Sequence, residues 1–137
     1  MNEDLQERLY YQKNREDPAQ IVLGFVRAMG RWEVACNQSK KLDREGLERI
    51  FAVYCTKRDR KYVKRVHFSN PPEYDAEKEV IEKVENRGKR TQVFTVTRFP
   101  FSHFRFYCYT LQHDEKGWRL DSKKVITTDG KETRSSL

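Results

Sequence analysis

The segment from residue 91 to residue 111 reads TQVFTVTRFPFSHFRFYCYTL. Its odd-numbered and even-numbered positions form two sets; in the first half, one set contains Val93, Thr95 and Thr97 and the other contains Phe94, Val96 and Arg98. Successive side chains of a β-strand point to opposite faces of a sheet, so this alternation predicts strands. We expect one strand at 91–99, a break at Pro100, and a second strand at 102–111. The second run is the richer in aromatic residues, which is typical of a central strand that helices cover on one side.

Turn signals on both sides extend this pair of strands into a meander. The turn predicted at 86–88 follows a strand at 79–84, and the turn at 114–117 leads into a last strand that reaches residue 126. Residues 79–84 also fit helical spacing, but the adjoining turn favours the strand. A short segment at 62–68, rich in β-forming residues and followed by two prolines, is expected to be a further strand.

The chain before the strands has helical periodicity instead. Asp17 and Pro18 form a start signal, because aspartate caps free backbone N–H groups and proline at the first helical position loses no hydrogen bond. This helix is expected to run to about Ser39, and a second helix is expected from Asp43 to about Thr56. The residues that recur on the two apolar faces are Ile21, Phe25, Met29, Trp32 and Cys36 in the first helix and Leu47, Ile50, Phe51 and Tyr54 in the second.

Helices first and strands afterwards are the order of an α+β domain. A length of 137 residues points to one domain. We therefore expect a curved antiparallel sheet with the N-terminal helices packed on one face. The expected parts are a leading helix or arm at 1–16, a single domain at 17–126 and a polar C-terminal tail at 127–137.

The charge balance is basic, with 28 Lys and Arg against 21 Asp and Glu and a formal charge of +7. Such a surplus favours solubility through self-repulsion, an acidic partner or nucleic acid. Basic residues are dense only at 57–65 and 87–90 and are mixed with acids in the N-terminal third, which weighs against nucleic acid. A nucleic-acid-binding module stays an alternative, because rings and basic residues are interleaved at 99–105.

The cysteines and histidines predict neither disulfides nor a metal site. The chain has three widely spaced cysteines, Cys36, Cys55 and Cys108. An odd number without a short pairing fits reduced thiols and a cytoplasmic location. No pair of Cys or His has short ligand spacing, and no Gly-rich phosphate loop is present, so no cofactor is expected. We also expect no signal peptide and no membrane span, because a run of about 20 apolar residues is missing.

Four stretches resemble proteins of the nuclear transport factor 2-like superfamily and, within it, the immunity proteins of bacterial polymorphic toxin systems. They are FVRAMGRWEVAC (25–36), LERIFAVYCTKR (47–58), PPEYDAEKEVI (71–81) and GWRLDSKK (117–124). The last stretch is typical of the superfamily as a whole, whereas YCTKR together with PPEYD is more particular to the immunity group. The resemblance implies a cone-shaped fold and neutralisation of a toxin by direct binding, without catalytic residues. It also implies a possible homodimer, because members often pair through their sheets.

A small-molecule isomerase or dehydratase is the second alternative, because the wider superfamily contains such enzymes. Their chemistry needs a base in an apolar pocket and donors for an oxyanion. His103, Tyr107 and Tyr109 share one predicted strand face, and Asp121 or Glu82 could pair with the histidine. Arg105 lies on that same face, and a cationic neighbour argues against a dry pocket.

The predicted corner between the two aromatic strands is the leading candidate for a partner-binding site. Aromatic and arginine side chains are enriched at the centres of protein interfaces, and exposed apolar rings favour a covering partner. Tyr74, beside two prolines, is a further candidate, although its ring could instead pin its loop to the sheet. The expected partner is a toxin with an acidic patch, and the expected contact residues are Tyr74, Arg98, Phe99, Phe101, His103 and Arg105.

Overall fold

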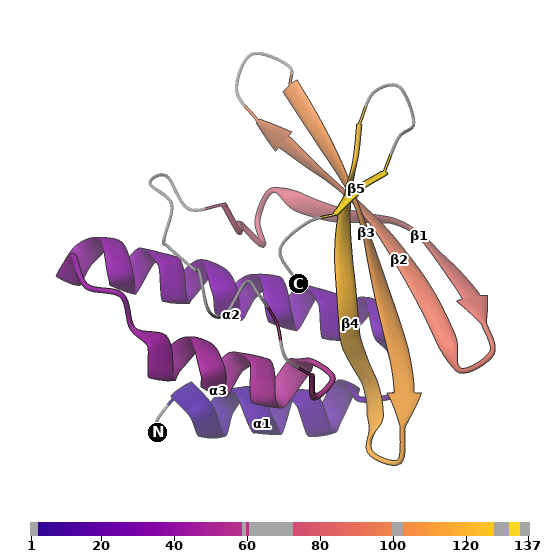
Figure 1. Ribbon diagram of the computed structural model, residues 1–137, viewed down its shortest axis with the longest axis horizontal. Coiled ribbons are helices and arrows are strands. Elements are labelled where there is room, and N and C mark those ends of the chain that lie inside the picture. Colours follow the sequence, from indigo (N-terminus) through magenta and orange to yellow (C-terminus); the bar gives the residue numbers. More distant parts are fainter. Residues whose placement is uncertain (1–2, 59, 61–72, 100–102, 128–131, 135–137) are drawn as a thin grey trace.

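Three helices precede a five-stranded antiparallel sheet in this computed structural model (Figure 1). The structure describes residues 3–58, 60, 73–99, 103–127 and 132–134. The helices are α1 (Glu3–Asn14), α2 (Pro18–Ser39) and α3 (Arg44–Tyr54), and the strands are β1 (Glu79–Arg87), β2 (Arg90–Phe99), β3 (His103–Asp114), β4 (Gly117–Ile126) and β5 (Glu132–Arg134).

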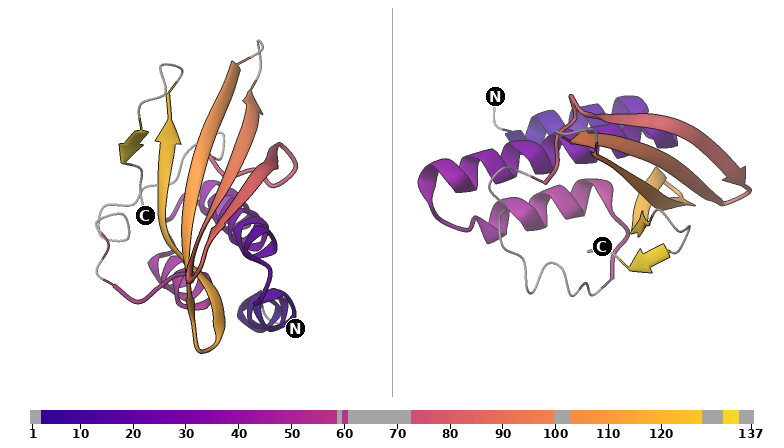
Figure 2. Two further views of the ribbon diagram at one scale, coloured as in Figure 1. Left: turned by 90° about the vertical axis from the view of Figure 1, so that its right-hand side faces the viewer. Right: turned by 90° about the horizontal axis from the view of Figure 1, so that it is seen from above.

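The sheet is a simple meander in which each strand pairs with its sequence neighbours, in the order β1-β2-β3-β4-β5. The strand predicted at 79–84 is confirmed, and so are the strands that the alternation at 91–111 predicts. Figure 2 shows the strands twisting past one another while the three helices gather on one side of the sheet. The architecture is the predicted curved antiparallel sheet with N-terminal helices on one face. The strand expected at 62–68 lies outside the described residues.

Alternation along the strands separates an inner face, which the helices cover, from an outer face. On β2 the inner residues Thr91, Val93, Thr95 and Thr97 are all buried. On β3 the inner residues Tyr107, Tyr109 and Leu111 are buried in the main core, together with residues of α2 and α3. Helix α2 contacts the sheet at β2 and β4.

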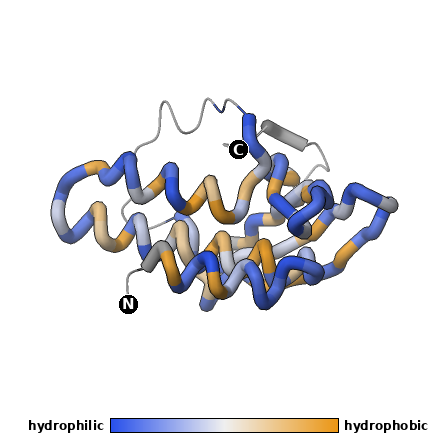
Figure 3. Tube along the Cα trace, turned by 90° about the horizontal axis from the view of Figure 1, so that it is seen from below, coloured by the Kyte–Doolittle hydropathy of each residue, from blue (hydrophilic) through white to orange (hydrophobic). Residues whose placement is uncertain are grey.

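Both predicted helix starts are confirmed. The Asp17 side chain accepts a hydrogen bond from the backbone N–H of Gln20, and Asp43 accepts one from Gly46. Figure 3 shows polar and apolar stretches alternating along the helical part of the chain, as expected for helices with one buried face. A Cβ atom at Gly30 would lie 2.8 Å from the carbonyl oxygen of Tyr74, so this glycine lets the segment before β1 lie directly on α2.

The leading segment is a helix, the first of the two possibilities that the sequence left open. Tyr11 of α1 is buried, and its hydroxyl donates to the carbonyl oxygen of Trp118 over 2.8 Å. The Tyr54 hydroxyl of α3 donates to the Glu7 carboxylate of α1 over 2.7 Å. Helix α1 therefore contributes to the core and contacts both α3 and β4.

The C-terminal part contains a strand that the sequence did not predict. Residues from 127 onward were expected to form only a polar tail, but β5 pairs with Lys124, Val125 and Ile126 of β4. The segment ETR has no apolar alternation, so only backbone pairing with β4 accounts for it. All three cysteines are buried and free, as expected, and none of the helices that the structure describes is long and apolar enough to cross a membrane.

Candidate protein-binding surface and buried polar cluster

The β2–β3 corner brings most of the predicted contact residues to one end of the sheet. Arg98 is exposed and lies opposite Phe104, and exposed Arg105 lies opposite Thr97. The backbones of Phe99 and His103 form the last pair of the ladder. The side chains of these two residues, and Phe101 as a whole, lie outside the described residues. Two basic side chains and one ring therefore flank the corner in the described part of the chain.

Tyr74 lies elsewhere, inside the domain. Its side chain is 2% exposed, and its ring packs edge-on against the Phe25 ring with the centroids 5.8 Å apart. The backbone N–H of Tyr74 donates to the Glu33 carboxylate over 2.9 Å. This environment matches the second possibility raised for Tyr74, that its ring pins its loop to the domain, and its side chain has almost no surface to offer a partner.

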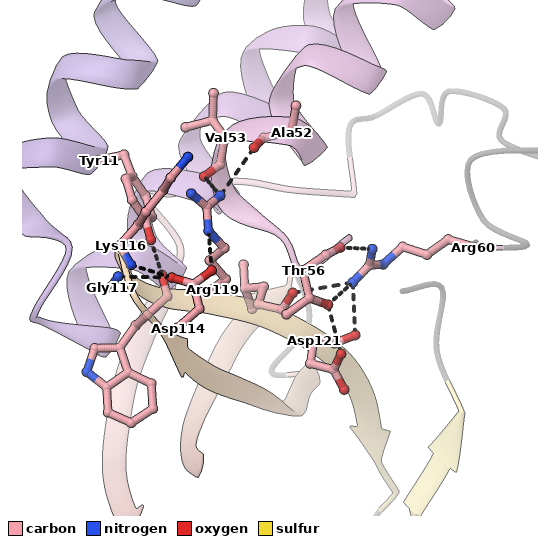
Figure 4. A network of polar contacts seen from close by, with 12 residues as sticks. Tyr11, Ala52, Val53, Thr56, Arg60, Asp114, Lys116, Gly117, Arg119 and Asp121 are labelled. Carbon is pink, nitrogen blue, oxygen red and sulfur yellow. Dashed lines mark hydrogen bonds and ion pairs between the residues drawn. The ribbon is translucent and has the colours of Figure 1, made fainter. Parts of the chain in front are cut away.

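The start of the basic run at 57–65 is tied to the protein itself (Figure 4). Arg60 is 5% exposed and donates to the carbonyl oxygen and the hydroxyl of Thr56 and to the carbonyl oxygens of Leu120 and Asp121. Burial lowers the pKa of Arg60. Arg58 donates to the carbonyl oxygen of Asp121 over 2.7 Å. These two guanidinium groups hold the end of α3 against β4, which weakens the case for a nucleic-acid surface built on them.

A second network holds the β3–β4 hairpin to the helices (Figure 4). The Arg119 guanidinium donates to the carbonyl oxygen of Val53 over 2.9 Å and to the Asp114 carboxylate over 3.0 Å. Partial burial acts to raise the pKa of Asp114, but hydrogen bonds from the backbone N–H groups of Lys116 and Gly117 and from Arg119 lower it overall. These contacts fix the position of the hairpin rather than a reactive group.

A cluster of polar side chains lies buried on the inner face. The Lys123 ammonium group is 4.1 Å from the ring centroid of Tyr74 and 4.2 Å from that of Tyr107, and the residue is 2% exposed. Glu79, 4% exposed, accepts hydrogen bonds from the Thr95 hydroxyl over 2.6 Å and from the Tyr109 hydroxyl over 2.7 Å. A buried cation, its aromatic neighbours and a hydrogen-bonded carboxylate thus share the space between α2 and the sheet.

This cluster differs from the catalytic arrangement that the sequence left open. The acid beside the strand tyrosines is Glu79, whereas Glu82 is exposed and Asp121 accepts a hydrogen bond from Thr56 over 2.8 Å. Burial and the neighbouring Glu79 carboxylate raise the pKa of Tyr109 well above its usual value, and burial lowers the pKa of Lys123. Sequence reasoning missed Glu79 and Lys123, since neither stands out from the other acids and lysines of its strand.

The outer face presents apolar side chains that sequence reasoning did not combine. Cross-strand pairing places Val80 of β1 opposite Val96 of β2, Val96 opposite Phe106 of β3, and Phe106 opposite Ile126 of β4. Phe94 and Phe104 lie on the same face by alternation. None of these side chains belongs to the main core. We call this set of six residues the outer patch: Val80, Phe94, Val96, Phe104, Phe106 and Ile126.

Helices packed on one face of a twisted antiparallel meander define an α+β protein, and this architecture is consistent with the nuclear transport factor 2-like fold. Residues 17–136 match the family model described as NTF2 fold immunity protein, and the chain belongs to this family. It is a toxin-neutralising immunity protein.

A named relative agrees with this assignment. The chain is 29% identical over 115 residues to immunity protein RhsIA of Dickeya dadantii (strain 3937), an alignment that covers 76% of this chain and 83% of the relative. A comparison with solved structures finds no match.

Proposed function

We propose that this protein neutralises its toxin by forming a stoichiometric complex, without catalytic turnover, and that the β2–β3 corner contacts the toxin. The observation that carries the proposal is the family match over residues 17–136. The corner is supported by the exposure of Arg98 and Arg105 at the same end of the sheet, since arginine is enriched at binding hot spots. Phe99, Phe101 and His103 are the further residues proposed for this contact.

The proposed partner surface is acidic. A formal charge of +7 attracts an acidic patch and accelerates association, and salt screens this attraction over about 8 Å at physiological ionic strength. The association rate is therefore expected to fall as salt is raised, while the dissociation rate changes less. An association rate that is the same at low and high salt would remove the acidic patch from the proposal.

The experiment that tests the function is co-expression with the protein encoded by the neighbouring toxin gene. Growth should be restored at an immunity-to-toxin ratio near one, and the two proteins should elute together from a sizing column. Protection at a ratio far below one would instead indicate turnover and favour the enzyme alternative. A shift of labelled nucleic acid that survives about 150 mM salt would favour the nucleic-acid alternative.

The corner is tested with Arg98→Ala and Arg105→Ala, each measured by titration calorimetry against an inactive form of the toxin. We expect each change to weaken the complex roughly tenfold, because arginine is enriched among the few interface residues whose truncation costs most of the binding energy. Arg49→Ala on α3 is the matched control, because its side chain is 53% exposed and its ion pair with Glu45 is long, at 3.9 Å. Wild-type affinity in both corner variants would move the contact away from the corner.

Location and assembly complete the proposal. Three buried free thiols fit the reducing cytoplasm, where the toxin would threaten the cell that makes it. A homodimer is the assembly that the superfamily resemblance implies, and sedimentation of the purified protein at several concentrations tests it.

A further inference from the structure

We infer that the outer patch, with the basic residues around it, is the principal docking surface for the toxin. This inference rests on the proposed function, because it names the surface through which neutralisation takes place. The inference goes beyond the corner. The corner lies only at the end of the sheet that carries Arg98 and Phe104, whereas the outer patch extends over four strands.

The exposure of the outer patch carries the first part of the argument. Val80 is 57% exposed and Phe104 is 53% exposed, and Phe94, Val96, Phe106 and Ile126 are half-buried. Single exposed apolar residues are normal on a protein surface, but a contiguous set is typical of an interaction site. Here the set is contiguous because strand register brings the residues into one row, Val80–Val96–Phe106–Ile126, with Phe94 and Phe104 on either side.

The support beneath the patch is rigid. The same strands carry the buried inner face, where Tyr107 and Tyr109 alternate with Phe106 and Cys108 along β3. Cys108 is 1% exposed although it lies on the outer face, where it is paired with Phe94 and Lys124. A partner that docks here meets side chains held by a regular ladder, and little conformational freedom remains to be lost on binding.

The charge around the patch indicates the partner. Basic residues occupy many ladder positions on the outer face, among them Lys83, Arg87, Arg90, Arg98 and Lys124. Glu85 is an acid at a paired position there, and it already lies 3.2 Å from Lys83 and 3.4 Å from Arg87, while on β5 the backbone of Glu132 pairs with Ile126. An apolar centre with a basic rim is complementary to a protein surface with an apolar centre and an acidic rim.

The same charge argues against the other occupants. Two copies of this face would bring like charges together, which disfavours an interface between them. Nucleic acid could use the basic rim and the rings of the patch, but three of the four residues in its central row, Val80, Val96 and Ile126, are aliphatic and suit an apolar protein surface better than bases. The acidic toxin is therefore the occupant to which the face is best matched.

The experiment measures the affinity of outer-patch variants for the inactive toxin encoded by the neighbouring gene. Phe104→Ala and Val80→Ala should each weaken binding at least tenfold, and the double variant should abolish protection in co-expression. Leu9→Ala on α1 is the matched control, because Leu9 is also 53% exposed and apolar but lies on a helix. The control should bind like the wild type, and the melting temperatures should show that all variants are folded.

The outcomes separate the surface from the function. If the wild type binds and protects, and the outer-patch variants bind equally well, the docking surface is overturned while the function stands. If the wild type neither binds nor protects, the proposed function fails and the inference fails with it. Loss of binding in Leu9→Ala but not in Phe104→Ala would place the toxin on the helical side. A dimer that Phe104→Ala dissociates would assign the outer patch to a second copy and overturn the inference.

Discussion

The two faces of the sheet distribute polarity in opposite ways. The inner face buries charged groups, Glu79 at 4% exposure and Lys123 at 2%, whereas the outer face leaves Val80 and Phe104 more than half exposed. Folding alone would favour the reverse arrangement, because buried charges cost free energy and apolar surface gains by burial. The contrast indicates that the inner face is arranged to define one packing of helices on sheet, and the outer face is arranged for contact with another molecule.

The largest expected effect comes from the inner face. Glu79→Gln should lower the free energy of unfolding by about 3 kcal/mol, because it removes a carboxylate that accepts two hydrogen bonds and is the strongest of the three acidic neighbours of the Lys123 ammonium group, leaving Glu73 and Glu33. Urea unfolding monitored by circular dichroism measures it. Glu82→Gln, an exposed acid on the same strand, should change stability by less than about 0.5 kcal/mol. Equal effects of the two changes would remove the distinction between the faces.

An intermediate effect is expected from pH. Burial lowers the pKa of Lys123 in the folded chain below its ordinary value of 10.5. At pH values between the pKa of the folded chain and 10.5, the unfolded chain therefore binds the proton more strongly than the folded chain does. Stability contributed by this group therefore rises with pH across that window. Lys123→Met should lose this rise, whereas Lys124→Met, on the outer face, should keep it.

Buried tyrosines and thiols titrate in the same alkaline range, but the wild type and the Lys123→Met variant both contain them. The difference between the unfolding curves of Lys123→Met and the wild type therefore isolates Lys123. A difference that does not change with pH below 10.5 would mean that the ammonium group is effectively solvated in the folded chain.

The smallest effect on stability is expected on the outer face. Phe104→Ala should change the free energy of unfolding by less than about 0.5 kcal/mol, because the ring has little buried surface to lose. Thermal unfolding followed by calorimetry measures the change. A loss comparable to that of Glu79→Gln would show that the ring is part of the folded core, and the outer patch would then lose its most exposed ring.

Local pattern was sufficient to predict most of the fold. The alternation at 91–111 predicted β2 and β3, and Asp17 and Asp43 marked the starts of α2 and α3, because capping and strand alternation depend on near neighbours in the sequence. Strand β5 was missed because its three residues are held by pairing with β4 and carry no pattern of their own.

The buried cluster could not be predicted for a specific reason. Continuing the alternation from Trp118 and Leu120 along β4 would place Lys124 on the inner face. An irregularity in the ladder between Thr110 and Leu111 leaves Asp121 as an extra residue and moves Lys123 inward instead. On β1 several glutamates lie close together, and only the register with Thr95 and Tyr109 selects Glu79 for burial.

The position of the candidate contact residues in the fold was predicted in part, and their contact with a toxin stays a prediction. The corner was located correctly in the chain, since Pro100 separates two aromatic strands whose ends meet there. Tyr74 was placed among the contact residues because its neighbouring prolines suggested an exposed loop, but the close approach of this loop to Gly30 buries the side chain. The outer patch needed the register of four strands, and this long-range information is not visible in any one segment.

The contact between α1 and β4 has a consequence for synthesis of the protein in the cell. The Tyr11 hydroxyl reaches the carbonyl oxygen of Trp118, a residue 107 positions later in the chain. This contact forms only after the ribosome has made β4. Most of the chain is therefore synthesised before α1 can make its contact with Trp118. A chain that stops before residue 118 therefore lacks the carbonyl group that ties Tyr11 of α1 to β4.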